Sequence, residues 1–210
     1  MELLVSSANA QPTGVVEGTV SLTRLSVGSQ LSGPEDVLVF LEDAPSVKPA
    51  AKGPFQIVQA QKAFNPRVLV VPVGATVEFP NADDFSHNVF SPSPTSKFDL
   101  GFFPKGSSRS VTFTEPGIVP VYCNVHPNML AYVVVVKNHF FVRPDASGRF
   151  RFEGVPPGVY QAVAWSPFTN LARVEARVSP ADVPPLELKL RERMGAGRHL
   201  NKTGKPYGLY

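Results

Sequence analysis

The sequence predicts an all-β protein, and three observations support this fold class. First, 22 prolines and 16 glycines are spread over the 210 residues, which is typical of short strands joined by tight turns. Second, the segments between these turns are rich in valine and phenylalanine, and several alternate apolar with polar residues. Third, no stretch has the length and periodicity of an amphipathic helix. An apolar content of 43% is ample for a hydrophobic core.

The central region, 54–138, has a regular rhythm of strands and turns. Strands are expected at 67–72, 76–79, 86–90, 97–103, 109–113, 119–123 and 130–137. The last of these contains four consecutive valines, 133–136, and such an unbroken apolar run predicts a strand that is buried on both faces.

The two flanks of this region, 12–53 and 139–190, contain further strand patterns. They are expected at 14–22, 37–41, 140–152 (with a turn at 145–148), 159–165, 174–178 and 186–190. Neither flank has enough strands to bury its own apolar faces. We therefore expect both to form one discontinuous β-sandwich with the central region inserted, the alternatives being one enlarged sandwich or two unrelated pieces.

Three motifs of the flanks resemble a known family. They are Gly18-Thr-Val20, the apolar strand 37–41, and the segment from Asp145 to Tyr160 with its Pro-Pro-Gly-x-Tyr ending. This set is similar to the carboxypeptidase-regulatory or transthyretin-like β-sandwich. The resemblance implies that the flanks form such a sandwich beside the central one.

A candidate metal site lies in the central region. Cys123, His126 and Met129 are three residues apart on one expected loop, and His87 is the obvious source of a second imidazole. Thiolate and thioether sulfur suit Cu(I) and imidazole suits both copper states, so this donor set predicts a copper site. A zinc site is the alternative, although structural zinc prefers more thiolates. A binuclear copper centre with two cysteines is excluded because the chain has one cysteine.

Two segments of the central region resemble the cupredoxins. "VLVVPVGATVEFPNADDFSHNVF" is similar to the family's first-ligand segment, and "PGIVPVYCNVHPNM" is similar to its closing segment. The two-residue spacing between histidine and methionine is that of amicyanins. The resemblance implies a Greek-key β-sandwich that holds one type 1 copper ion per chain, with His87, Cys123, His126 and Met129 as ligands.

The same resemblance implies roles for three neighbours of the ligands: Ser86, Asn88 and Pro127. The backbone N–H of Asn88 is expected to bond the Cys123 sulfur, and its side chain to tie the two ligand segments together. Pro127 has no N–H, so a second donor to the sulfur is expected to be missing, which would lower the reduction potential.

The function that follows from the resemblance is a single-electron carrier rather than an enzyme. Its redox partners, such as a dehydrogenase or a cytochrome, are expected to dock near His126, on a patch formed by Pro127 with Phe85, Phe90 or Leu130. The rival function is non-redox: copper storage, delivery or sensing, or an adhesion or docking protein in which the flanking sandwich dominates.

The net charge of +3 is concentrated in a basic C-terminal tail, 191–210. This tail is expected to be solvated or to dock on an acidic partner, and nucleic-acid binding is not expected. His199 in this tail and His139 at the junction of the two regions are expected to be surface residues outside the metal site.

Residues 1–11 resemble the end of an export signal, with Ala8-Asn9-Ala10 as a small-x-small cleavage motif. This predicts a periplasmic or otherwise exported protein. No run approaches 18 apolar residues, so no membrane span is expected.

Overall fold

The computed structural model describes residues 13–25, 36–46, 52–179, 183–193 and 199–207. Within these ranges it contains 17 strands and no α-helix, so the predicted all-β class is confirmed. None of the described residues forms a helix long and apolar enough to cross a membrane. The proposed signal motif, Ala8-Asn9-Ala10, lies outside the described residues.

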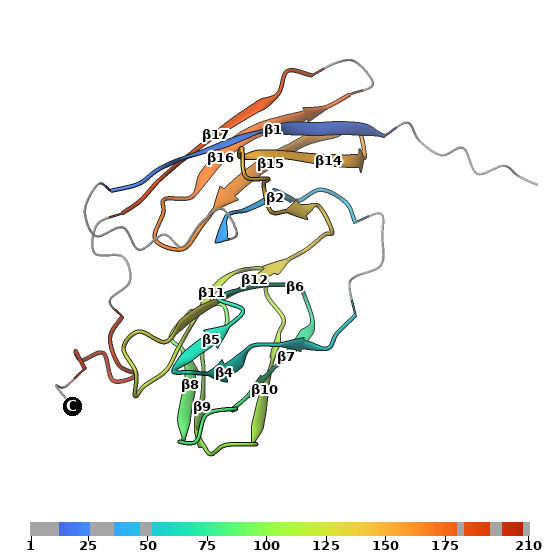
Figure 1. Cartoon of the computed structure of the whole chain (residues 1–210). Helices are drawn as coiled ribbons and strands as arrows, with labels where there is room; N and C mark the ends of the chain where they lie inside the picture. Colours follow the sequence, from blue (N-terminus) through green and yellow to red (C-terminus); the bar gives the residue numbers. More distant parts are fainter. Residues whose placement is uncertain (1–12, 26–35, 47–51, 180–182, 194–198, 208–210) are drawn as a thin grey trace, which may run out of the picture.

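The central region folds into a β-sandwich (Figure 1). One sheet has the order β6-β12-β11-β8-β9, the opposing sheet β10-β7-β3, and β4 and β5 form a small hairpin. Neighbouring strands are often distant in sequence, as in a Greek key: β12 pairs with β6 in parallel and with β11 in antiparallel register. The strands are β3 (Phe55–Gln56), β4 (Val58–Ala60), β5 (Ala63–Asn65), β6 (Val68–Pro72), β7 (Ala75–Pro80), β8 (His87–Ser91), β9 (Phe98–Phe103), β10 (Ser108–Phe113), β11 (Gly117–Tyr122) and β12 (Leu130–Val136).

The strands of the two flanks share two further sheets. One has the order β14-β1-β17, and the other has the order β13-β2-β15-β16, so each contains strands from before and after the central region. These strands are β1 (Gly14–Thr23), β2 (Leu38–Glu42), β13 (Phe141–Val142), β14 (Arg149–Val155), β15 (Gly158–Trp165), β16 (Ala172–Val178) and β17 (Leu186–Arg191). The resemblance of this flanking sandwich to the carboxypeptidase-regulatory family stays a prediction.

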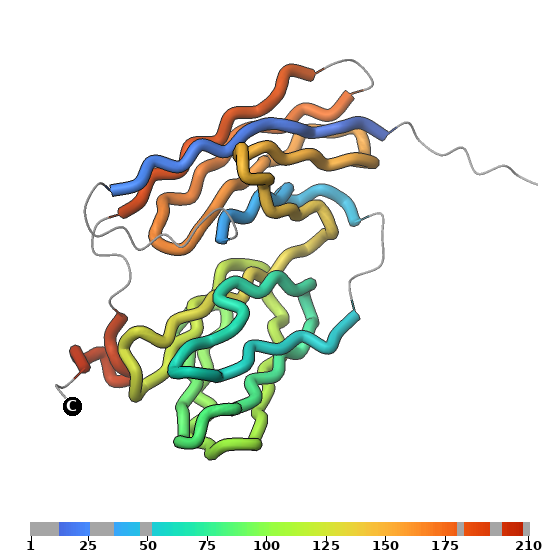
Figure 2. The backbone as a smooth tube through the Cα atoms, viewed as in Figure 1, coloured from blue at the N-terminus to red at the C-terminus, as the bar shows by residue number. Residues whose placement is uncertain are grey.

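The two sandwiches pack against each other through β12 (Figures 1 and 2). Val133 and Val135 point into the core of the central sandwich, whereas Val134 and Val136 belong to a separate apolar cluster with Trp165 of the flanking sandwich. All four valines are buried, as predicted. The second face of β12 is therefore covered by the flanking sandwich.

Candidate metal centre

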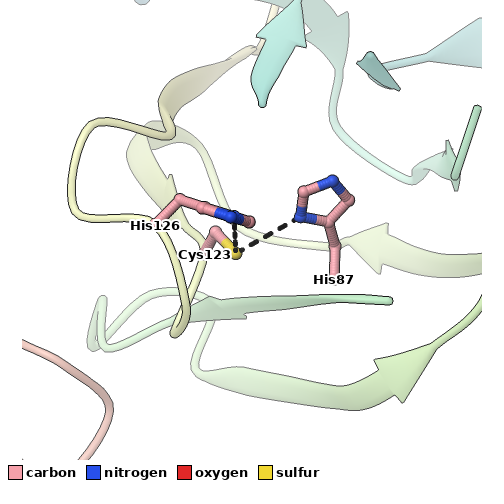
Figure 3. Close-up of side chains that lie close together, drawn as sticks. All are labelled: His87, Cys123 and His126. Carbon is pink, nitrogen blue, oxygen red and sulfur yellow. Dashed lines mark hydrogen bonds between the residues drawn. The ribbon is translucent and has the colours of Figure 1, made fainter. Parts of the chain in front are cut away.

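Three potential metal ligands meet at one end of the central sandwich (Figure 3). His87 is the first residue of β8, Cys123 follows the end of β11, and His126 lies in the loop between β11 and β12. Nδ1 of His87 lies 3.7 Å from the Cys123 sulfur, and Nδ1 of His126 lies 3.8 Å from it. The three donor atoms all lie within 4.8 Å of one another.

The three potential ligands differ in their exposure to solvent. His87 and Cys123 are fully buried, and His126 is only partly buried. Met129, the fourth predicted ligand, is also fully buried and belongs to the same core cluster as Cys123. The site is therefore enclosed by protein on the core side and has its partly exposed edge at His126.

The loop that carries Cys123, His126 and Met129 is closed by its own backbone. The N–H of Cys123 donates to the carbonyl of Met129 at 3.2 Å, and the N–H of Met129 donates to the carbonyl of His126 at 3.1 Å. These bonds bring the two ends of the loop together, so Cys123 and Met129, six residues apart in the sequence, lie next to each other.

The structure places two neighbours of the ligands differently from what was expected. The N–H of Val125 donates to the Cys123 sulfur at 3.4 Å, so the loop supplies a donor that the sequence did not predict. The side chain of Asn88 is directed elsewhere: its amide nitrogen donates to Asp99 at 2.7 Å and does not tie the ligand segments directly. Pro127 and Ser86 are exposed.

Sequence reasoning missed Asp83, which holds the first histidine. Its carboxylate lies 2.8 Å from Nε2 of His87, so Nδ1 is left to face the sulfur. The same carboxylate accepts from the backbone N–H groups of Gln61 at 2.6 Å and Lys62 at 2.9 Å. Both residues have positive φ angles, 55° and 58°, and this left-handed turn between β4 and β5 aims two successive N–H groups at Asp83.

These donors also control the charge of Asp83. Partial burial acts to raise its pKa, but the hydrogen bonds from Lys62, His87 and Gln61 outweigh that effect and hold the pKa below its usual value. Asp83 is thus an anion beside the imidazole. A carboxylate on the outer nitrogen of a ligating histidine fixes the tautomer and ring orientation and raises its basicity.

An exposed aromatic ring lies over the two histidines. The ring centroid of Phe85 is 5.0 Å from that of His87 and 5.6 Å from that of His126, and 40% of Phe85 is exposed. Phe90 is buried and Leu130 is half-buried, so Phe85 is the exposed one of the three predicted patch residues. Burial, with His87 and Lys62 nearby, lowers the pKa of His126 and keeps this imidazole neutral at pH 7.

The donor set and its spacing fit a copper ion. A transition metal bound to one Cys sulfur at about 2.3 Å and to histidine nitrogens at about 2.0 Å, the lengths known from zinc sites, separates sulfur from nitrogen by about 3.7 Å in a trigonal plane. The structure has 3.7 Å and 3.8 Å. No fourth His, Cys, Asp or Glu of the described residues joins the cluster, as a structural zinc site would require.

The other two histidines lie outside this cluster. Nδ1 of His139 is 3.5 Å from the hydroxyl of Ser46, and its ring lies against Phe140 at the junction of the sandwiches. His199 stacks on Tyr122, the residue before Cys123, with ring centroids 4.2 Å apart. The C-terminal segment therefore lies beside the site, which the sequence did not predict.

The central region matches a known protein family. Residues 51–137 match the family described as "Copper binding proteins, plastocyanin/azurin family". The search of curated proteins found no match.

Several solved structures are similar to part of the chain. A purple cupredoxin from Nitrosopumilus maritimus is 28% identical, covers 39% of this chain and 99% of its own, and has a TM-score of 0.36. A mutant amicyanin in the Cu(I) form is 26% identical, covers 46% of this chain and 97% of its own, and has a TM-score of 0.38. A copper-containing nitrite reductase from Thermus scotoductus is 24% identical, covers 56% of this chain and 28% of its own, and has a TM-score of 0.39.

The family match covers β8, which begins at His87, and the loop between β11 and β12, which contains Cys123, His126 and Met129. The proteins of this family bind copper, and the central sandwich brings together a sulfur and two imidazoles suited to that metal. Residues 51–137 therefore form a cupredoxin domain, which matches the plastocyanin/azurin family of copper-binding proteins.

Proposed function

We propose that this protein is a type 1 copper protein that carries single electrons between redox partners, with one copper ion per chain. In this proposal His87, Cys123 and His126 would hold the copper ion, and the buried Met129 of the same loop would offer a thioether as a further, weaker donor. Copper bound there supplies a one-electron couple between Cu(II) and Cu(I). The observation that supports the proposal best is the spacing of the sulfur from the two imidazole nitrogens, 3.7 Å and 3.8 Å.

The residues around the ligands favour electron transfer because they hold the donors in place. His87 starts a fully buried strand and is bonded to Asp83, while backbone hydrogen bonds close the loop of Cys123. Ligands held by such bonds give both copper states similar surroundings, so little reorganisation is expected to accompany the transfer.

The partly exposed edge at His126 is the proposed point of contact with partners. Phe85 and Pro127 are exposed next to it, which gives a small apolar patch around an imidazole. Transient redox encounters use small interfaces of this kind. A dehydrogenase or a cytochrome is the proposed partner class, and an exported location is proposed on the basis of the signal-like motif. The protein itself is proposed to be a carrier and not an enzyme.

A visible spectrum tests this function. Metal-free full-length protein is mixed with Cu(II), and an intense sulfur-to-copper charge-transfer band that ascorbate bleaches and an oxidant restores is the expected result. Colourless protein that still binds Cu(I) would instead support the storage or delivery function. Protein that binds copper but shows no reversible absorption band would contradict the proposed electron-carrier function.

A further inference from the structure

The C-terminal segment 199–207 returns to the cupredoxin domain after the chain has left it. β17 ends at Arg191 in the flanking sandwich, yet segment 199–207 lies beside the loop between β11 and β12 (Figures 1 and 2). We name this segment the clasp. Most residues of 199–207 are exposed, as expected of a solvated tail, but the contacts of this segment with the loop were not predicted; 194–198 and 208–210 lie outside the described ranges.

The clasp is bonded directly to the start of the ligand loop. The hydroxyl of Tyr207 donates to the carbonyl of Cys123 at 2.6 Å. The backbone N–H of Lys202 donates to the side-chain oxygen of Asn124, the next residue, at 2.9 Å. Two separate points of the clasp thus hold two successive residues of the loop.

The same clasp also reaches the strand of the first histidine. Nζ of Lys202 lies 2.8 Å from one carboxylate oxygen of Asp99, and the other oxygen accepts from the side chain of Asn88, which follows His87. Burial of Asp99 acts to raise its pKa, but the bonds from Lys202, Gly101 and Asn88 outweigh it and lower the pKa. Lys202 therefore links the His87 strand and the Cys123 loop.

Aromatic contacts and an internal turn give the clasp a defined shape. His199 stacks on Tyr122 at an interplanar angle of 21°, and the ring of Tyr207 meets His199 edge-on at 5.2 Å. The side-chain oxygen of Asn201 accepts from the N–H groups of Thr203 and Lys205, both at 3.0 Å. A segment that already has a defined conformation loses little conformational entropy when it contacts the ligand loop. Its contacts therefore stabilise the loop more than those of a flexible segment would.

We propose that the clasp is a positioning element of the copper site, in which Tyr207 and Lys202 hold the ligand loop and the His87 strand in register. This inference rests on the proposed copper function. None of the clasp residues is a ligand in it: they act through Cys123, Asn124 and Asn88. The hydroxyl dipole of Tyr207 points its positive end at the Cys123 carbonyl, which favours the reduced site because that site has one more negative charge.

The test compares Tyr207→Phe and Lys202→Ala with two matched controls in full-length protein. Tyr160→Phe removes a tyrosine hydroxyl that donates to a carbonyl, that of Pro156, in the flanking sandwich. Lys189→Ala removes an exposed lysine paired with Glu187 in that sandwich. Three quantities are measured: amide hydrogen exchange of 123–129 without metal, the rate of Cu(I) loss to a chelator, and the midpoint potential.

In Tyr207→Phe, we expect loop exchange and Cu(I) loss to be faster by roughly fivefold, the usual effect of one hydrogen bond, and the midpoint potential to be lower. Lys202→Ala is expected to act in the same direction on exchange and loss, and it also decides the matter if Tyr207→Phe does not fold. Equal loop exchange and Cu(I) loss in these variants and in their controls would overturn the inference.

The two proposals fail in different ways. If the wild-type protein shows no reversible copper band, the carrier function fails. Slower amide exchange of the loop in metal-free wild-type protein than in metal-free Tyr207→Phe would still support the clasp. If the wild-type band is present and the clasp variants behave like Tyr160→Phe and Lys189→Ala, only the clasp inference fails.

Discussion

The two sandwiches of this chain are built from similar strands but differ at their ends. The core of the flanking sandwich is a cluster of Val, Phe, Leu and Ala side chains, and its turn at 145–148 is held by Asp145, which accepts from Ser147 and Arg149. The core of the central sandwich is equally apolar, but at one end it buries His87, Asn88 and Cys123. Two similar β-sandwiches thus differ in their capacity to bind a metal because only one of them buries imidazole and sulfur groups at the end of its core.

The largest effect on this difference is expected from Cys123→Ser. A hydroxyl in place of the thiolate removes the donor responsible for the charge-transfer band, so the band should disappear and copper affinity should fall by more than roughly 100-fold, beyond the usual effect of outer partners. The fold should persist because the change removes no methylene. Visible absorption and circular dichroism measure both results, and a retained band would contradict the ligand assignment.

The second prediction concerns a substitution that should weaken the flanking sandwich and leave the metal site unchanged. β1 pairs with both β14 and β17, and a Cβ on Gly18 would overlap the carbonyl oxygen of Leu186. Gly18→Ala is therefore expected to lower the free energy of unfolding by about 3 kcal/mol, as measured by urea denaturation, while the copper band of the folded protein keeps its position. Thr19→Ala, an exposed change on the same strand, is the control. A shifted band would show that the sandwiches are not separable in function.

Asp83→Asn tests one contact of the site. Loss of the carboxylate charge next to His87 disfavours Cu(II), so the midpoint potential should rise by about 60 mV, which corresponds to a tenfold change for one electron. Voltammetry measures this shift. Asp84→Asn is the control, since Asp84 is exposed and pairs with Lys105. An unchanged potential in Asp83→Asn would mean that the carboxylate only fixes the turn.

A smaller shift is expected from Val125→Pro. Proline has no N–H, so the sulfur of Cys123 loses its 3.4 Å donor and the thiolate becomes more electron-rich. The potential should fall by about 30 mV, half of a tenfold change. Val125→Ala keeps the N–H and should leave the potential near the wild-type value. A fall of the same size in Val125→Ala would assign the effect to packing.

The smallest effect is the pH dependence of the metal-free protein. Burial lowers the pKa of His126 and of His199 below the unfolded value of about 6.5. Below that pH the unfolded chain binds protons that the folded chain does not, so the free energy of unfolding should decrease as the pH falls from 7.5 to 5.5. Urea midpoints measure this trend, and His199→Gln should make it shallower. A midpoint that rises on acidification would contradict both shifts.

The longer strands and the grouping of Cys123, His126 and Met129 on one loop were predictable because each depends on local patterns. Period-two alternation marks β7 and β15, and Cys123, His126 and Met129 share one short loop. The short strands β3, β4 and β5 were missed because they have two or three residues each. Such lengths leave no period to detect.

Asp83 and the clasp were missed for a different physical reason. Asp83 is placed by a left-handed turn at Gln61 and Lys62, about twenty residues away in the sequence. Tyr207 meets Cys123 across a separation of 84 residues. The donor to the sulfur was missed for a local reason: it is the residue two positions after the cysteine, Val125, whereas the prediction considered only Asn88 and Pro127.

The path of the chain limits how this protein can be divided. After β2 the chain passes to the central sandwich, it leaves after β12, and it comes back after β17 as segment 199–207. Residues 54–138 excised as a gene fragment would therefore lose both the cover over Val134 and Val136 and the hydroxyl of Tyr207. Its metal loop belongs to a unit that is contiguous in space but not in the sequence, so domain swaps and fusions need to carry the C-terminus with it.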